Sequence, residues 1–451
     1  MKPITVFLRL AVVLLILGII VLYFPKEGLD ISGFNLRMPS MEDIFLSKQP
    51  EYADVDKILV DNTSDTTGKK QDDGIVGFEY GSEAKEQLDS FFLALDSLKQ
   101  TDNTSIRILH YGDSQIEGDR ISGYLRKKLQ KTFGGHGQGE IPMYSLSQIK
   151  GVIYNYSSDW EFHSIIQPQA GYNRYGTMMS SIKALADSAI TELNFASPTD
   201  CELTIYFASP DKESRLKISD RQKDLLEINI PQTASLQQES IRLTAQSRYL
   251  RIEADAGAEL YGMDLSDGNG LYLDNISLRG SSGWGIRQCN KTILETMAND
   301  LNVRLVIMQF GVNAIPQKEN KIIKDYTFYK TEFAKQLKYL HATLPDAAII
   351  VVGVSDRSIR QGDNYITNPN VFKLRQAQKE AALENGCIFW DLFEAMGGEN
   401  SMPAWVLRDE PLANKDFIHF NNKGAEHVAT MFLNALRKEY KAYRQRTQSN
   451  R

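Results

Sequence analysis

The run Ile106-Arg107-Ile108-Leu109-His110-Tyr111, followed directly by Gly112-Asp113-Ser114-Gln115, decides the fold of this chain. Its first six residues are rich in Ile, Leu and Tyr and are typical of a buried strand. The next four form a turn, and residues 118–133 have the apolar spacing of a helix. A strand, a turn and a helix in this order begin an α/β unit.

The same alternation continues after residue 300. Predicted strands cover residues 303–310, 347–352 and 387–390, and predicted helices cover residues 322–343, 371–384 and 422–443. A further amphipathic helix over residues 84–98 precedes the first strand. Alternating strands and helices imply a parallel sheet with helices on both faces, so we expect a three-layer α/β domain.

The pattern changes between these two parts of the α/β domain. Short runs with alternating apolar residues, such as 202–207 and 225–230, are separated by turn residues at the spacing of a β-sandwich. We therefore expect an inserted β-sandwich module at residues 141–278, within an α/β domain made of residues 81–140 and 279–443. The module either grips or binds carbohydrate or is a structural insertion without a ligand, and the sequence leaves both open.

The N-terminal segment predicts a membrane anchor. Lys2 and Arg9 precede the apolar run Leu10–Phe24, and the span reaches 21 residues when counted from Ile4, with Arg9 near its inner end. This is enough to cross a bilayer core of about 30 Å. No small residues mark a cleavage site, so residues 1–24 are expected to be an uncleaved signal anchor. The positive residues predict a single-pass protein of a cell inner membrane, with the catalytic domain on the periplasmic or extracellular side.

Two further segments are expected to lie outside the globular domains. Residues 25–80 are predicted to be a stalk, because the stretch 61–74 is polar and poor in core-forming residues. Residues 444–451 are predicted to be a basic tail after the last helix.

The composition excludes some classes of function. A net charge of −6 gives no reason to expect nucleic-acid binding. The cysteines Cys201, Cys289 and Cys387 are isolated and lack CxxC spacing. We therefore expect no metal cluster and at most one intramolecular disulfide.

Ser114 and the loop Asp416-Phe417-Ile418-His419 supply the parts of a nucleophilic site. A serine hydroxyl needs a base within hydrogen-bond reach, and the base needs an acceptor on its other nitrogen. An Asp three residues before a His can accept from Nδ1 while Nε2 points at the serine. Ser114 follows a strand, and the Asp416–His419 loop follows the last strand, so both are expected at the carboxyl edge of the sheet.

Two other motifs are expected at the same edge. Gly280-Ser281-Ser282-Gly283 follows an apolar run, and Gly311-Val312-Asn313-Ala314 follows the predicted strand 303–310. Acyl transfer builds negative charge on a carbonyl oxygen, which donors such as the Asn313 amide and the backbone N–H groups of Gly283 and Ser114 could stabilise. Each motif alone is more often a turn or a loop hydrogen-bond pair, but four in this order favour a hydrolase.

This order of motifs resembles the four blocks of the SGNH (GDSL-like) hydrolase superfamily, over residues 82–135 and 279–440. The resemblance implies a flavodoxin-like α/β fold that needs no metal or organic cofactor. It implies a catalytic triad of Ser114, Asp416 and His419, with Ser114, Gly283 and Asn313 forming the oxyanion hole.

The chain also departs from the usual SGNH pattern. Gln115 replaces the usual leucine after the serine, and Ala314 replaces the usual aspartate after Asn313, which places the subfamily in doubt more than the chemistry. The long insertion after Ser114 is similar to the arrangement in bacterial peptidoglycan O-acetyl esterases and related O-acetyltransferases.

We therefore expect an exported, membrane-anchored serine esterase that removes O-acetyl groups from a cell-wall or other polysaccharide. The alternative is an O-acetyltransferase that uses the same triad, with a membrane-bound acyltransferase as a partner. A third possibility, from another class, is a glycan-binding protein with an inactive site. The other histidines are expected to be structural or solvated, and His110 is the least certain of them because it lies four residues before Ser114.

Overall fold

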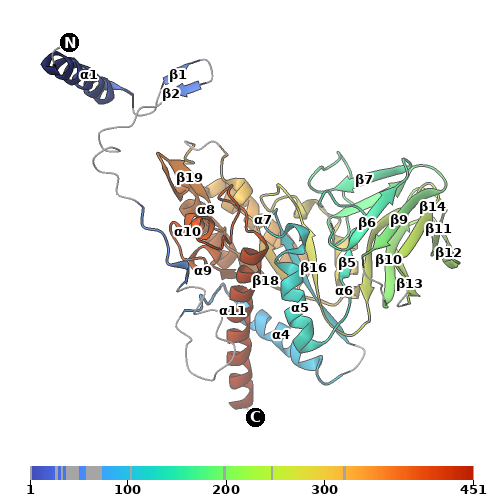
Figure 1. The fold of residues 1–451 in the computed structure, drawn as a ribbon. Helices are drawn as coiled ribbons and strands as arrows, with labels where there is room; N and C mark the ends of the chain where they lie inside the picture. The colour runs from blue at the N-terminus through green and yellow to red at the C-terminus, as the bar shows by residue number, and fades with distance from the viewer. Residues whose placement is uncertain are drawn as a thin grey trace.

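A mixed sheet forms the centre of the α/β domain in the computed structural model (Figure 1). Its strands lie in the order β16 (Gly270–Ser277), β4 (Ser105–Gly112), β17 (Val303–Gln309), β18 (Ala348–Val352), β21 (Ile388–Trp390) and β3 (Phe78–Tyr80). The structure describes residues 3–25, 29–31, 34–36, 50–56, 74–101, 104–147, 149–196, 200–244, 247–317 and 321–449.

The first five strands of this order are parallel and confirm the expected fold class. Numbered along the chain, they follow the order 2-1-3-4-5, which is the flavodoxin-like arrangement. In this sheet the strand order reverses between β4 and β17, which are the first and third parallel strands along the chain. Ligands bind outside the carboxyl ends of the strands at that point.

Helices cover both faces of the sheet because the central strands are apolar on both sides. Ile106 and Ile108 of β4 contribute to one core, while Leu109 and Tyr111 contribute to the other. The first core is closed by α4 (Ala84–Ser97), α5 (Ser122–Phe133) and α11 (Asn422–Ser449). The second core is closed by α6 (Lys291–Asp300), α7 (Thr327–Thr343) and α8 (Pro369–Glu384).

Smaller elements connect these layers. They are the short helices η1 (Glu117–Asp119), η2 (Ile286–Gln288), η3 (Val312–Ala314), α9 (Leu392–Ala395) and α10 (Ser401–Leu407), and the hairpin of β19 (Ser358–Gln361) and β20 (Asn364–Thr367). The hairpin of β1 (Leu29–Ile31) and β2 (Phe34–Leu36) lies near the N-terminus.

The β-module is a sandwich with a shared apolar core, as its alternating sequence predicts. One sheet contains β13 (Thr233–Arg242), β10 (Glu202–Ser209), β15 (Glu259–Ser266), β8 (Ser180–Ala184) and β7 (Trp160–Ser164), with β5 (Gly139–Ile141) paired to β15. The other contains β12 (Asp224–Ile230), β11 (Ser214–Ser219), β14 (Tyr249–Ala254), β9 (Ala189–Phe195) and β6 (Val152–Tyr156). Figure 1 shows this module beside the α/β domain.

The predicted end of the module at residue 278 is wrong. Strand β16 pairs with β4 in parallel over its whole length, so residues 270–277 belong to the α/β sheet. The module therefore ends with β15 at Ser266. The sequence of β16 alternates like that of a sandwich strand. Only its pairing with β4 shows that it belongs to the α/β sheet and not to the module.

The predicted start of the α/β domain at residue 81 is also wrong. Strand β3 pairs antiparallel with β21, and Phe78 lies in the core of the domain. Val55 is buried in the same core, and the backbone carbonyl of Glu51 accepts a hydrogen bond from Asn400. Residues 50–56 and 74–80 thus pack on the domain, whereas residues 57–73, which include most of the predicted polar stretch, lie outside the described residues.

The two ends of the chain are helical. Helix α1 spans Pro3–Tyr23, and its stretch Ile4–Tyr23 has a mean hydropathy of 2.9, which is sufficient in length and composition for a membrane span. At the other end, α11 continues to Ser449, and Arg446 forms an ion pair with Asp89 of α4 at 2.7 Å. The predicted break between helix and basic tail at residue 443 is therefore wrong.

Candidate active site

Ser114 lies in the tight turn between β4 and η1, where its side chain is mostly buried. The turn needs Gly112 at the end of the strand. A Cβ atom at Gly112 would lie 2.8 Å from Ile116 Cδ1 and 3.0 Å from the carbonyl oxygen of Gln309. The absence of a side chain lets the chain turn closely against β17 and brings Ser114 to the carboxyl edge of the sheet.

The structure brings Ser114, His419 and Asp416 together in one hydrogen-bonded chain. The Oγ of Ser114 lies 2.8 Å from Nε2 of His419, and Nδ1 of His419 lies 2.7 Å from Oδ2 of Asp416. The serine and the histidine are 305 residues apart in sequence. The geometry is that of a nucleophile, a base and an orienting carboxylate.

The Asp416 carboxylate is held in its orientation by its own loop. Its Oδ1 accepts hydrogen bonds from the backbone N–H groups of Ile418 and His419, each at 3.0 Å. Phe417 adopts a φ of 57°, which turns the backbone so that these N–H groups face the carboxylate. Partial burial raises the pKa of Asp416, but the hydrogen bonds from His419 and Ile418 outweigh it and bring the pKa to about 2.

Two side chains fasten the histidine loop to the serine turn. Gln115 donates from Nε2 to the carbonyl of Ile418 at 2.8 Å, and its Oε1 accepts from the N–H of Phe420 at 3.3 Å. Arg120 donates to the carbonyl of Ser114 at 2.5 Å and to that of Phe420 at 2.9 Å. The residues on either side of His419 are thus bonded to groups next to Ser114.

Asp113 connects the serine turn to the Gly311–Asn313 loop. Its carboxylate accepts hydrogen bonds from the backbone N–H groups of Gln115, Gly311 and Val312. Burial raises the pKa of Asp113 to about 7 despite these donors. On the other side of the loop, Arg357 donates to the carbonyls of Val312 and Ile315 at 2.8 and 3.1 Å.

The two other predicted oxyanion-hole residues, Gly283 and Asn313, both contact Ser281. The Gly283 N–H donates to Ser281 Oγ, and Asn313 Nδ2 donates to the Ser281 carbonyl, each at 3.0 Å. Gly283 has a φ of 89°, and a Cβ there would lie 2.9 Å from the ring of Phe333. The structure therefore brings the second and third motifs together, as their order in the sequence predicts.

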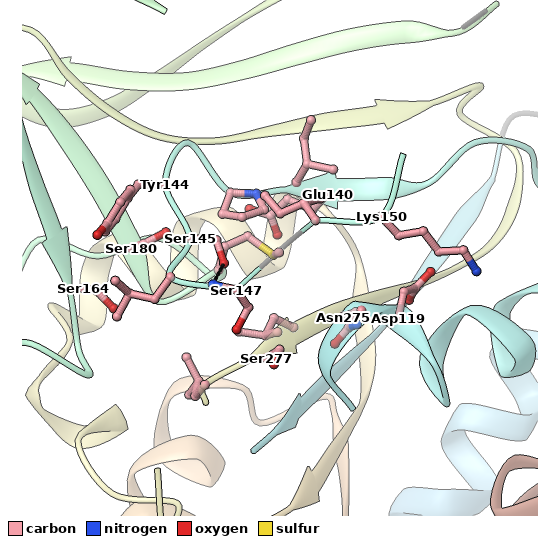
Figure 2. A pocket seen from close by; sticks show the side chains of 18 of the residues that line it. Asp119, Glu140, Tyr144, Ser145, Ser147, Lys150, Ser164, Ser180, Asn275 and Ser277 are labelled. Atoms are coloured by element: carbon pink, nitrogen blue, oxygen red, sulfur yellow. Dashed lines mark hydrogen bonds between the residues drawn. The ribbon is translucent and has the colours of Figure 1, made fainter. Parts of the chain in front are cut away.

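A cavity of about 50 Å³ lies at the boundary between the module and the α/β domain. We call it the boundary cavity. Figure 2 shows that its labelled side chains include Ser145, Ser147, Ser164, Ser180 and Ser277. Ser114 does not line this cavity, but Ser277 Oγ donates to the carbonyl of Asp113 at 3.5 Å, so one wall contacts the serine turn.

His110 has a structural role, as expected for most of the histidines. Its Nε2 lies 3.1 Å from Gln309 Oε1 and its Nδ1 lies 2.9 Å from Ser122 Oγ. Burial lowers the pKa of His110 to about 4. The ring is therefore a neutral hydrogen-bonding group between β4, β17 and α5.

Sequence reasoning missed Arg120 and Arg357 and treated Gln115 only as a departure from a pattern. Arg120 lies six residues after the serine and Arg357 follows a strand. Nothing in the neighbouring sequence of either residue indicates which groups it binds. Gln115 offered a signal, because an amide in place of an apolar residue beside the nucleophile needs hydrogen-bond partners when buried.

Residues 244–427 match the model of the GDSL-like Lipase/Acylhydrolase family. A solved structure of a peptidoglycan O-acetylesterase matches with a TM-score of 0.66 at 19% identity, covering 81% of this chain and 99% of the other. The family match and the shared fold support the SGNH (GDSL-like) hydrolase superfamily for the α/β domain.

The matched part of the chain includes the predicted site residues Gly283, Asn313, Asp416 and His419 and begins after Ser114. Two further solved structures match over most of their own length. The salicylyl-acyltransferase SsfX3 has a TM-score of 0.27 at 11% identity, covering 67% of this chain and 98% of the other. A carbohydrate-binding module of Cellvibrio mixtus lichenase 5A has a TM-score of 0.19 at 17% identity, covering 29% of this chain and 96% of the other. No curated protein matches the sequence.

The family match and the fold support an enzyme that hydrolyses or transfers acyl groups. Within the described residues, no group of three or more His, Cys, Asp or Glu side chains is placed to hold a metal ion.

Proposed function

We propose that the protein is a serine esterase that removes O-acetyl groups from a polysaccharide. The observation that carries this proposal is the hydrogen-bonded chain from Ser114 through His419 to Asp416, with distances of 2.8 and 2.7 Å. A neutral imidazole at this distance accepts the proton of the serine hydroxyl, while the ionised Asp416 stabilises the imidazolium that forms.

In the first half of the proposed reaction, Ser114 Oγ attacks the carbonyl carbon of the acetyl ester and its proton moves to His419 Nε2. The tetrahedral intermediate then collapses. The bond to the sugar oxygen breaks, and this oxygen takes the proton from His419 and leaves as a free hydroxyl group. The acetyl group remains on Ser114.

In the second half, a water molecule transfers a proton to His419 and attacks the acetyl-serine carbonyl. Collapse of this second intermediate releases acetate and returns the proton to Ser114 Oγ. The negative charge on the carbonyl oxygen would be stabilised by the backbone N–H of Ser114 and by the Asn313 amide, and by the Gly283 N–H once it exchanges Ser281 Oγ for the oxyanion. An amide nitrogen has two N–H groups, so Asn313 could bind Ser281 and the oxyanion together.

The polysaccharide part of the proposal is supported by the architecture. The matched peptidoglycan O-acetylesterase shares the fold of both domains over 81% of this chain. In this chain the module borders the serine turn through the boundary cavity, whose lining is rich in hydroxyl groups. Hydroxyl-lined surfaces beside an ester-cleaving site suit a substrate that is itself rich in hydroxyl groups.

We further propose that α1 anchors the enzyme in a membrane. The stretch Ile4–Tyr23 is apolar and is not buried against the rest of the chain, so a lipid environment would stabilise it. A signal sequence has the same properties, and analysis of the mature N-terminus distinguishes the two cases.

The test of the esterase is Ser114→Ala, measured with a chromogenic acetyl ester and with an O-acetylated polysaccharide. We expect kcat to fall by about 10,000-fold or more, because the nucleophile of the triad is removed. The matched control is Ser90→Ala, which removes an exposed hydroxyl on α4 and is expected to leave kcat unchanged. Full turnover by a folded Ser114→Ala protein would contradict the mechanism.

The same assay separates hydrolysis from transfer. Hydrolysis releases free acetate in proportion to ester loss, whereas transfer moves the acetyl group to an added acceptor glycan without release. Predominant acetylation of the acceptor would replace the esterase with the O-acetyltransferase alternative.

A further inference from the structure

A groove of about 650 Å³ runs along α5 beside the boundary cavity. We call it the lysine groove. The groove and the cavity share the lining residues Asp119, Arg126, Gln138 and Lys150. Figure 2 shows Asp119 and Lys150 together at one side of the cavity, and both residues also line the groove.

The lysine groove is cationic although the whole chain has a net charge of −6. Lys127 and Lys131 lie four residues apart on one face of α5, and Lys150 lies on the loop that follows β5 of the module. Within the described residues none of these lysines forms an ion pair. The acidic side chain in the lining, Asp119, is neutralised by Arg126 through two hydrogen bonds of 2.7 and 3.0 Å.

The boundary cavity contains buried polar atoms that lack partners among the described residues. These atoms are Ser147 Oγ and Ser180 Oγ from the module side and Asn275 Oδ1 from β16. Ser147 is 8% exposed and Ser180 is 3% exposed. Buried hydroxyl and amide oxygens without partners are costly, so a ligand with hydroxyl groups would satisfy them.

The walls of the cavity are bonded to both sides of the serine turn. Asn275 Nδ2 donates to the carbonyl of Ile116 at 3.0 Å, and Ser277 Oγ donates to that of Asp113. A sugar hydroxyl group that enters the cavity would therefore lie against residues bonded to both sides of the serine turn.

We propose that the lysine groove and the boundary cavity together bind a stretch of an anionic polysaccharide. Its acidic groups would lie at Lys127, Lys131 and Lys150, and its hydroxyl groups would lie at Ser147, Ser180 and Asn275. Binding itself does not require Ser114. Only the statement that this ligand is also the substrate rests on the proposed function.

Binding is measured by calorimetry with the full-length Ser114→Ala protein in detergent micelles. The probes are polygalacturonate, which is anionic, and glucomannan, which is neutral. We expect polygalacturonate to bind more tightly, and its Kd to rise when NaCl is raised from about 50 to about 300 mM, since salt screens exposed charges. Tighter binding of glucomannan at low salt would overturn the proposal.

The lysines are tested by adding Lys127→Glu and Lys131→Glu together. We expect the Kd for polygalacturonate to rise about tenfold, because two attractive contacts become repulsive. The matched control adds Lys128→Glu and Lys338→Glu, which make the same charge change outside the groove on α5 and α7. Equal Kd values for the two double variants would overturn the role of the groove.

The cavity is tested with Ser180→Val, which replaces an unpartnered hydroxyl with a larger apolar group. We expect a rise of about fivefold in the Kd for polygalacturonate, with the salt dependence retained. An unchanged Kd would remove the cavity from the site. Failure of the esterase is recognised separately: a protein with Ser114 intact that binds polygalacturonate but cleaves no acetyl ester refutes the proposed function and leaves this binding site standing.

Discussion

At the scale of single residues, Gln115 gives the clearest link between a departure in sequence and a role in geometry. Its amide donates to the carbonyl of Ile418 and accepts from the N–H of Phe420. These two residues flank His419, so one side chain fixes the backbone on both sides of the base. A leucine at this position could pack but could form neither hydrogen bond.

We predict that Gln115→Leu lowers kcat on a chromogenic acetyl ester by about tenfold while KM changes little. The loss of two hydrogen bonds, at about 1 kcal/mol each, lets His419 leave its position beside Ser114 Oγ. Steady-state kinetics well below the melting temperature measures the effect. Gln376→Leu, on the exposed face of α8, is the control and should keep the wild-type kcat. A rise in KM alone would mean that Gln115 acts on substrate binding and not on the histidine loop.

At the scale of elements, strand β3 shows how a short edge strand depends on its surroundings. It has three residues and pairs with β21, while Trp390 Nε1 donates to the carbonyl of Val76 just before it. Segment 50–56 packs nearby through Val55, and Asp56 forms an ion pair with Arg408 at 2.7 Å. Both segments are parts of the α/β domain although they precede its first predicted helix.

We predict that a protein beginning at residue 81 is less stable than one beginning at residue 50. The shorter chain loses the buried side chains of Phe78 and Val55, and burial of each contributes about 1.5–3 kcal/mol. The expected loss in the free energy of unfolding is therefore about 3–6 kcal/mol. Urea denaturation of the two proteins, followed by tryptophan fluorescence, measures the difference. Identical midpoints would show that residues 50–80 add nothing to the stability of the domain.

At the scale of the whole molecule, a buried charge network joins the two domains. Arg107 of β4 donates to Asp264 of the module at 2.8 Å and to Asp274 of β16 at 3.0 Å. Burial alone lowers the pKa of Arg107, but the two carboxylates more than offset it and hold the pKa above its usual value. Burial raises the pKa of Asp274 to about 6. The pairing of Arg107 with both carboxylates is what makes their burial tolerable.

We predict that Arg107→Leu lowers the free energy of unfolding by about 3–5 kcal/mol, because it leaves two buried carboxylates without a counter-charge. The sign of the pH dependence follows from Asp274. Arg107 lowers the pKa of Asp274, so its loss raises the folded pKa of this buried acid further above the unfolded value. The variant therefore loses more stability than the wild type as pH rises, and the deficit should be larger at about pH 8 than at about pH 5. Denaturant unfolding at both pH values measures it.

The control for this network is Arg242→Leu, which breaks the exposed pair with Asp200 and is expected to cost at most about 1 kcal/mol. A deficit for Arg107→Leu that is equally small, or that does not change with pH, would show that the network is not what stabilises the domain boundary.

The sequence by itself determined the parts of the protein that depend on local pattern. Apolar runs alternating with helical spacing predicted the parallel α/β sheet, and period-two runs predicted the sandwich, because each element buries its own repeating face. The order of the four motifs predicted that Ser114, Gly283, Asn313 and the Asp416–His419 loop lie at one edge. Parallel strands all end at the same side of a sheet, so this much follows from chain order alone.

The tertiary structure decided what depends on partners distant in sequence. The pairing of β16 with β4 and of β3 with β21 set the domain boundaries, which no local pattern shows. The hydrogen bonds of Gln115 and Arg120 to the histidine loop join residues about 300 positions apart. The boundary cavity likewise takes its polar atoms from both domains. Hydrogen bonds and packing act over a few ångströms in space, and folding alone brings these residues within that reach.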